Sequence, residues 1–238
     1  MSRKRQRNRA QRSEPGKTPA PAESNRALYL GAIAALLLAL LAGAALIKFK
    51  TSPDAPADDP ARQAALASDH SPTLGDAGAR VHIVEFLDPA CETCAQFYPV
   101  IKRLLADNPG RIRVSLLHVA FHDGAEYAVR VLEASRDQDK YWQTLEALFA
   151  TQAQWAPHHT VQPQLVDQAI AGVGLDLQRL AADMNSSDVS ARMARDRNDA
   201  IALKVTATPG YFVNGRPLPS FGYDQLLGVV NEELQAAY

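Results

Sequence analysis

The fold follows from one segment of the chain, Arg80-Val-His-Ile-Val-Glu-Phe-Leu-Asp-Pro-Ala-Cys-Glu-Thr-Cys-Ala-Gln-Phe-Tyr-Pro99. Its first part, residues 80–87, is apolar and rich in β-branched side chains, which predicts a buried strand. Residues 91–107 have the spacing of a helix, in which Pro99 should introduce a kink. Residues 111–119 repeat the strand pattern. The segment therefore predicts a β-α-β unit whose two strands run parallel.

The chain has two cysteines, Cys91 and Cys94, and both lie where the strand passes into the helix. At a helix start, unpaired backbone N–H groups and the positive end of the helix dipole stabilise a thiolate at Cys91. The spacing also allows Cys94 to reach back and close a small disulfide ring. These two features predict a dithiol that cycles between the thiol and disulfide states.

Other uses of a Cys-x-x-Cys pair are less consistent with this sequence. Half of a zinc site is one option, but the six histidines of the chain follow no zinc-finger spacing. A purely structural disulfide around so short a loop would restrain the unfolded chain very little. Haem attachment needs a histidine after the second cysteine, where this chain has Ala95. We predict no metal site, and a metal-binding or metal-delivery protein using Cys91, Cys94 and histidines stays as the non-enzymatic alternative.

Glu85 lies six residues before Cys91 in an otherwise apolar strand. A buried carboxylate is costly unless it is protonated or paired, so we expect its pKa to be raised. The alternation of a strand leaves a second option, in which Glu85 points to solvent.

The rest of the body is predicted to be mainly helical. Residues 124–204 contain several segments with apolar side chains at three- and four-residue spacings. Residues 210–218 then read as a hairpin, in which Asn214-Gly215 suits a tight type I′ turn. Residues 222–237 close the chain as an amphipathic helix.

Two motifs together resemble the thioredoxin superfamily. Cys91-x-x-Cys94, with Pro99 five residues after the second cysteine, is similar to the active-site segment of these proteins. Thr206-Ala-Thr-Pro-Gly-Tyr-Phe-Val-Asn-Gly215 resembles the segment in which they hold a cis-proline beside the dithiol.

The separation between the two motifs resembles the DsbA-like branch, in which a helical domain is inserted into the thioredoxin core. Cys94 and Pro209 are 115 residues apart, too far for a plain thioredoxin. The resemblance covers roughly residues 72–238. It implies an α/β, thioredoxin-like fold with an inserted helical domain at about residues 124–204.

The resemblance also implies roles for five residues. Cys91 would form the mixed disulfide with substrate, Cys94 would resolve it, and a buried Glu85 would relay the proton of Cys94. A cis Thr208–Pro209 bond would let the backbone of Thr208 pair with an extended substrate segment lying across Cys91. No cofactor is implied beyond the redox-active Cys91–Cys94 disulfide.

The residues between the cysteines depart from the family pattern. DsbA-type oxidants usually carry Pro-His there and thioredoxin carries Gly-Pro, whereas this chain has Glu92-Thr93. The charge of Glu92 opposes ionisation of Cys91. We expect disulfide formation. Because a stabilised reduced form is what makes a dithiol a strong oxidant, reductase and isomerase activity stay as the alternatives.

The N-terminal region predicts a membrane anchor. Residues 1–26 carry eight basic and two acidic residues, and residues 27–47 carry no charge at all. An apolar helix of this length spans ~30 Å, the thickness of a bilayer core, and the basic tail places the N-terminus in the cytoplasm. A cleaved signal peptide is the competing interpretation, although its apolar region is usually only about 7–15 residues. Residues 48–70, with three prolines and no apolar period, predict a flexible linker.

The predicted topology places the acidic body, residues 71–238, outside the cytoplasmic membrane. We therefore expect a single-pass inner-membrane protein with a periplasmic catalytic domain that exchanges disulfides with exported proteins. By resemblance, its re-oxidising partner would be a quinone-linked membrane protein of the DsbB kind. The net charge of −1 over the whole chain gives no indication of nucleic-acid binding.

Overall fold

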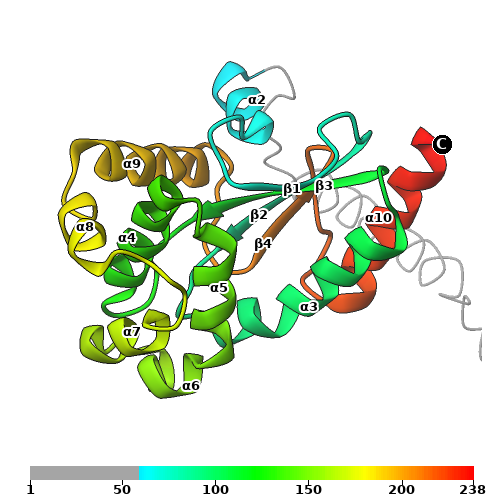
Figure 1. The fold of residues 1–238 in the computed structure, drawn as a ribbon. Helices are drawn as coiled ribbons and strands as arrows, with labels where there is room; N and C mark the ends of the chain where they lie inside the picture. The colour runs from blue at the N-terminus through cyan, green and yellow to red at the C-terminus, as the bar shows by residue number, and fades with distance from the viewer. Residues whose placement is uncertain (1–58) are drawn as a thin grey trace, which may run out of the picture. The chain divides into compact units, whose positions relative to one another are not determined.

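The computed structural model describes residues 59–238, drawn in colour in Figure 1. The predicted basic tail at 1–26, the predicted membrane helix at 27–47 and the first part of the predicted linker lie outside the described residues. Within residues 59–238, no helix is both long enough and apolar enough to cross a bilayer.

A mixed sheet runs through the described part of the chain, with the strand order β1-β3-β2-β4-β5. The strands are β1 (Thr73–Gly75), β2 (Val81–Leu87), β3 (Ile112–His118), β4 (Gly210–Val213) and β5 (Arg216–Pro217). β2 pairs in parallel with β3, and α3 (Glu92–Asp107) connects them, which confirms the predicted β-α-β unit. β1 is antiparallel to β3, and β4 is antiparallel to both β2 and β5.

Helices fill the interval between β3 and β4, as the sequence pattern predicts. Figure 1 shows this group gathered beside one end of the sheet. Its members are α4 (Ala125–Ser135), η1 (Arg136–Gln138), α5 (Tyr141–Ala150), α6 (Gln152–Trp155), η2 (Pro157–His159), α7 (Pro163–Ile170), α8 (Leu177–Asp183) and α9 (Ser187–Ala202). The short elements α6 and η2 were not expected, because three or four residues are too few to show a helical period.

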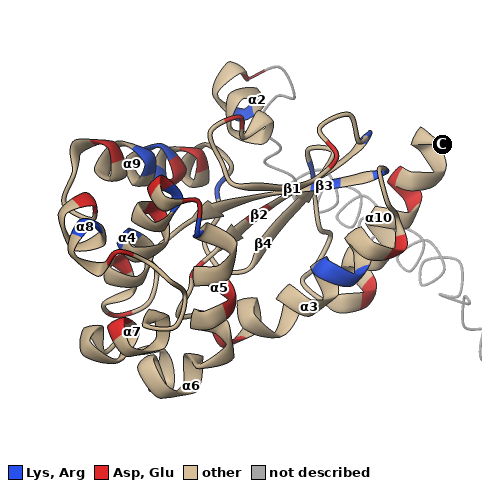
Figure 2. Cartoon of the chain, in the orientation of Figure 1, with Lys and Arg blue, Asp and Glu red and all other residues tan. Residues whose placement is uncertain are grey.

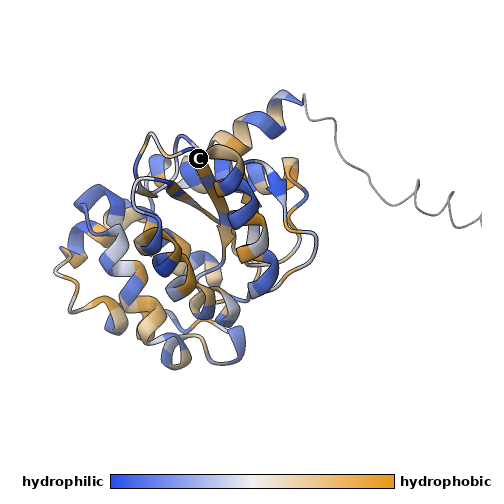
Figure 3. Cartoon of the chain, turned by 90° about the vertical axis from the view of Figure 1, so that its right-hand side faces the viewer, coloured by the Kyte–Doolittle hydropathy of each residue, from blue (hydrophilic) through white to orange (hydrophobic). Residues whose placement is uncertain are grey.

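Both faces of the central sheet are covered, which explains why every residue of β2 is buried. On one face, Ile83 and Leu87 belong to a large apolar core shared with α3, α10 (Tyr223–Ala237) and most of the inserted helices. On the other face, Val84 and Phe86 pack in a smaller core with residues of α9 and α2 (Pro60–Ala67). In Figure 3 the strands are coloured mostly hydrophobic, and the outer sides of the surrounding helices are more hydrophilic.

Helix α2 corrects one prediction. The flexible linker was expected to reach residue 70, and this is wrong for residues 60–67. Asp59 caps the helix by accepting a hydrogen bond from the N–H of Ala61 at 2.9 Å. Pro60 occupies the first helical turn, where its missing N–H costs nothing, and Ala65 is fully buried in the smaller core. A proline that reads as a linker signal is here a helix start.

The predicted hairpin is confirmed between β4 and β5. Asn214 and Gly215 both have positive φ, 47° and 81°, as a type I′ turn requires. The N–H of Asn214 donates to the carbonyl of His82, and its side-chain oxygen accepts the N–H of His82. The turn therefore fixes β4 against β2, which positions the chain that precedes β4.

Candidate functional site

The two cysteines lie at the start of α3. Cys91 is the N-cap residue with an extended backbone, and Cys94 is in the first turn. Both are free thiols and both are buried. The strand therefore delivers Cys91 to the helix N-terminus, where unpaired N–H groups face its sulfur.

The surroundings of Cys91 favour its thiolate. The hydrogen bond from the Cys94 thiol is the largest cause, and the hydrogen bonds with Thr208 and with the N–H groups of Thr93 and Cys94 add to it. Burial raises the pKa, but the hydrogen bonds outweigh it and lower the pKa of Cys91 to about 5. In the thiol form, Sγ of Cys91 also donates to the carbonyl of Thr208 at 3.4 Å.

The surroundings of Cys94 have the opposite effect. Burial, followed by the hydrogen bond to Cys91 and the charge of Glu85, raises the pKa of Cys94 far above its usual range. One thiol is therefore ionised at neutral pH while its neighbour is protonated and enclosed. This asymmetry agrees with the assignment of Cys91 as nucleophile and Cys94 as resolving thiol.

We expect the reduced protein to be alkylated at Cys91 with a rate that rises through a midpoint near pH 5. At pH 7 the rate at Cys94 should be lower by about 100-fold or more, because only a thiolate attacks the reagent. Iodoacetamide labelling followed by peptide mass spectrometry measures both rates. Equal and slow labelling of the two thiols would contradict the asymmetry.

Glu85 lies beneath the dithiol. It is only 2% exposed, so the option in which it points to solvent is wrong. Burial raises its pKa to about 8, although the hydroxyl of Tyr211 donates to Oε1 at 3.0 Å and opposes the shift. Oε2 is buried without a hydrogen-bond partner. Its role as the proton relay for Cys94 stays a prediction.

The segment before β4 closes the site. The Thr208–Pro209 bond is cis, in agreement with the expectation from the family resemblance. The carbonyl of Thr208 faces Sγ of Cys91, and Tyr211, two residues beyond Pro209, contacts Glu85. All five residues predicted for the site therefore belong to one connected cluster. That Thr208 binds substrate is a further prediction.

Two residues that hold the cysteine loop were not singled out from the sequence. Asp88 is fully buried, and its carboxylate accepts the N–H groups of Ala90, Phe121 and His122. Gln152, from α6, donates to the carbonyls of Pro89 and Cys91. The position of Asp88 at the end of a strand is a weak sequence signal. Gln152 has none, because it lies 61 residues beyond Cys91.

Glu92, which departs from the family pattern, has a basic neighbour. Nε2 of His159 lies 3.9 Å from Oε1 of Glu92, and the ring of His159 stacks on that of His122 with centroids 4.5 Å apart. Glu92 is also largely exposed, so solvent screens its charge. Solvent exposure therefore limits how strongly Glu92 can oppose ionisation of Cys91.

A groove of about 600 Å³ lies between α4, α9 and the segment that follows β3. Its lining includes the exposed apolar side chains Phe121 and Ile201. Phe121 is bonded through its N–H to Asp88, and Val205, also in the lining, precedes Thr208 by three residues. The lining combines apolar side chains with charged ones such as Glu126, Arg130 and Arg197, and it contains no residue of the cysteine motif.

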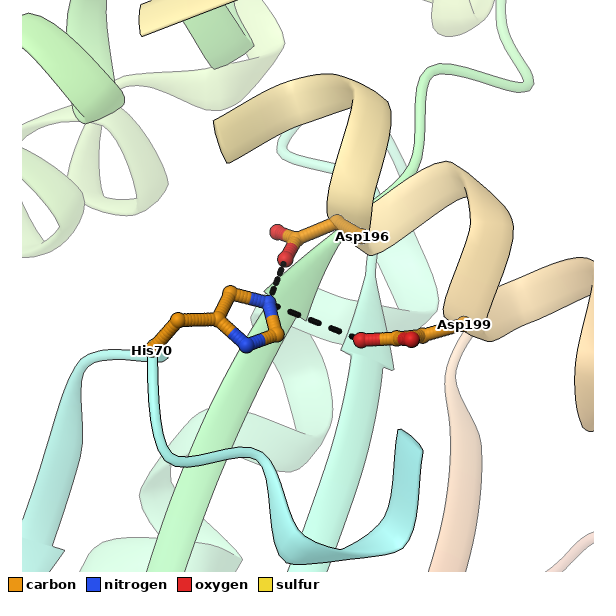
Figure 4. Close-up of side chains that lie close together, drawn as sticks. All are labelled: His70, Asp196 and Asp199. Carbon is orange, nitrogen blue, oxygen red and sulfur yellow. Dashed lines mark hydrogen bonds and ion pairs between the residues drawn. The ribbon is translucent and has the colours of Figure 1, made fainter. Parts of the chain in front are cut away.

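Two side-chain clusters in residues 59–238 have the donor types of a metal site, and neither contains a cysteine. In one, Nε2 of His70 lies 2.7 Å from Asp196 and 3.5 Å from Asp199 (Figure 4). The other joins His118, Glu133 and Asp196. Whether Cys91 and Cys94 bind a metal stays a question for the experiment described below.

The cluster at His118 is an ion-pair network. Arg136 and Arg192 both donate to Glu133 at 2.8 Å, and His118 bonds Glu133 at 2.9 Å. Arg192 lies on α9, along which Figure 2 shows charges of both signs. The network therefore joins α4 and α9 to the end of β3, beside the cysteine loop.

A family model described as thioredoxin matches residues 67–232. The chain belongs to this thioredoxin family. Disulfide bond formation protein D of Bacillus subtilis is 26% identical over 172 residues, which cover 69% of this chain and 77% of that protein. The crystal structure of Wolbachia pipientis alpha-DsbA1 is similar with a TM-score of 0.64 and 19% identity, and the match covers 74% of this chain and 97% of that one. The fold is therefore thioredoxin-like and similar to that of DsbA.

Some relatives are much longer than this thioredoxin-family chain. A Na⁺/H⁺ antiporter NhaA of Herminiimonas arsenicoxydans is 33% identical over 144 residues, which are 60% of this chain but only 22% of the antiporter. The chain therefore spans about a fifth of the length of that relative.

Proposed function

We propose that this chain is a thiol–disulfide oxidoreductase that exchanges a Cys91–Cys94 disulfide with protein substrates, in the direction of disulfide formation. The opposed pKa shifts of the two thiols are the observation that carries the proposal. A stabilised Cys91 thiolate stabilises the reduced form, and that makes the disulfide form an oxidant. The name of the Bacillus subtilis relative agrees with this direction.

The reaction proceeds in two exchanges. A substrate thiolate attacks Sγ of Cys91 in the disulfide, which forms the mixed disulfide and expels Cys94 as a thiolate. Glu85, whose pKa is raised to about 8, is protonated at neutral pH and supplies the proton that Cys94 takes up. A second substrate thiolate then attacks the substrate sulfur of the mixed disulfide and expels Cys91 as its stabilised thiolate. Two electrons pass from the substrate dithiol to Cys91 and Cys94.

Protein substrates are favoured by the surroundings of the dithiol. The backbone of Thr208 borders Cys91, where it can pair with an extended chain. The groove between α4 and α9 includes the exposed apolar side chains Phe121 and Ile201, on which side chains of such a segment can pack. An unfolded protein offers both an extended backbone and apolar side chains, whereas a small thiol offers neither.

The proposed setting is the outer face of the cytoplasmic membrane, with residues 27–47 as the anchor and a quinone-linked membrane protein of the DsbB kind as the oxidant. The charge-free run between a basic tail and the acidic body supports this topology. Exported proteins would then be the substrates. Cell fractionation with protease accessibility of residues 71–238 tests the location.

The reduction potential of the Cys91–Cys94 couple tests the direction. We expect a value between about −180 and −120 mV in glutathione buffers, and oxidation of a reduced, unfolded disulfide protein by stoichiometric oxidised enzyme. A potential below about −250 mV would instead assign a reductase. Stoichiometric zinc or copper bound to the reduced protein and lost in Cys91→Ser would favour the metal-binding alternative.

A further inference from the structure

Gln152 connects the inserted helices to the loop that carries Cys91. Its side chain is buried at the start of α6, and Nε2 donates to the carbonyl of Pro89 at 2.8 Å and to that of Cys91 at 3.0 Å. The two N–H groups of one amide are thus directed at two carbonyls on either side of Ala90. α6 packs against α7 and η2, so this contact is made by the insert and not by the sheet.

Asp88 holds the same loop from the other side. Its Oδ1 accepts the N–H of Ala90 at 2.8 Å, and its backbone carbonyl accepts the N–H of Cys91 at 3.0 Å. Asp88 therefore accepts hydrogen bonds from N–H groups of the loop, while Gln152 donates hydrogen bonds to carbonyl groups of the same loop. Between them they fix the direction in which the backbone enters α3.

The entry direction matters for the sulfur. The N–H groups of Thr93 and Cys94 stabilise the Cys91 thiolate, and hydrogen bonds of this kind weaken steeply as they lose alignment. The carbonyl of Cys91 keeps a second donor, the N–H of Ala95 at 3.3 Å, so the loss of Gln152 falls mainly on the carbonyl of Pro89. A buried carbonyl that loses its donor bears the cost of its desolvation, so the loop would turn to find another partner. Loss of the Gln152 donors therefore takes stabilisation away from the thiolate.

We propose that Gln152 is a positioning residue of the redox site, through which the inserted helices set the reduction potential of Cys91 and Cys94. This inference rests on the proposed oxidoreductase function. Gln152 touches no reacting atom in this scheme and acts only through the loop backbone. A merely structural role would instead affect the folding stability and leave the potential unchanged.

The test compares Gln152→Met with Gln154→Met. Methionine keeps the length and volume of the side chain and removes both donors. We expect the equilibrium constant for oxidation of glutathione to fall about tenfold in Gln152→Met, a shift of about −30 mV for a two-electron couple. The ultraviolet absorbance of the Cys91 thiolate should titrate with a midpoint about one pH unit higher. Gln154, on the same short helix but exposed, is the matched control, and its variant should change neither value.

Gln152→Glu provides a second measurement, also if the methionine variant does not fold. An ionised glutamate offers no donor and adds a negative charge beside the loop, so its shift should be larger than that of methionine and in the same direction. An unchanged potential and thiolate midpoint in a folded Gln152 variant would overturn the proposal. A wild-type protein that exchanges no disulfide with glutathione would instead refute the proposed function, so the two failures can be told apart.

Discussion

Cys91→Ser is expected to abolish disulfide exchange, with a loss of at least about a thousandfold in the rate of oxidation of a reduced protein. Serine cannot form a disulfide, and its hydroxyl stays protonated at neutral pH. The substitution removes the thiol whose pKa is lowered to about 5, and with it the thiolate nucleophile. Stopped-flow or gel-based measurement of substrate oxidation, with the variant and the wild type at equal concentration, checks the loss.

Cys94→Ser is the matched control because it removes the other sulfur of the same motif. Cys91 keeps its place at the helix N-terminus, so a substrate disulfide can still be attacked. With no resolving thiol, the product should be a stable mixed disulfide between Cys91 and the substrate, released by dithiothreitol. Adduct formation by Cys91→Ser instead of Cys94→Ser would reverse the assigned roles.

The chemistry at this site could be predicted because it depends on local sequence. Cys91 and Cys94 are three residues apart. The spacing of apolar residues predicts both the strand before them and the helix after them. The hairpin at Asn214-Gly215 can also be predicted from local sequence, because a type I′ turn favours those two residues. The pairing of Thr208 with Cys91 spans 117 residues and was reached only through the family resemblance.

Contacts made across the insert could not be predicted in this way. Gln152 in α6 has no pattern that distinguishes it from the exposed Gln154, and only the three-dimensional structure brings it to the carbonyl of Cys91. The error at α2 has a different physical origin. Pro60 is equally compatible with a loop and with a first helical turn, and tertiary burial of Ala65 decides between them.

Glu85→Gln is expected to make the reduced protein more stable at neutral pH and less active. Burial raises the folded-state pKa of Glu85 from 4.5 to about 8. A raised pKa means that the carboxyl contributes its full stability below about pH 4.5 and that this contribution is lost as the pH rises toward 8. At pH 7 the unfolded chain carries an ionised glutamate and the folded chain a protonated one, at a cost on the order of 3 kcal/mol.

Glutamine resembles the protonated carboxyl in shape and can still accept the hydroxyl of Tyr211, but it does not titrate. The difference in unfolding free energy between Glu85→Gln and the wild type should therefore be near zero at pH 4 and grow steadily between about pH 5 and pH 8. Urea denaturation with both thiols reduced measures it. The titration of Cys91 adds stability over the same range in both proteins, so the comparison removes most of its effect.

Activity should change in the opposite direction, because the glutamine that replaces Glu85 has no proton to give when Cys94 leaves as a thiolate. We expect the exchange rate at pH 7 to fall by about 10–100-fold, while the Cys91 thiolate still forms below neutral pH. A proton-relay function predicts that the protein keeps a buried acid even though this acid lowers the unfolding free energy at neutral pH. If Glu85→Gln stabilised the protein but left the exchange rate and its pH profile unchanged, Glu85 would be a buried acid without a part in the proton transfer.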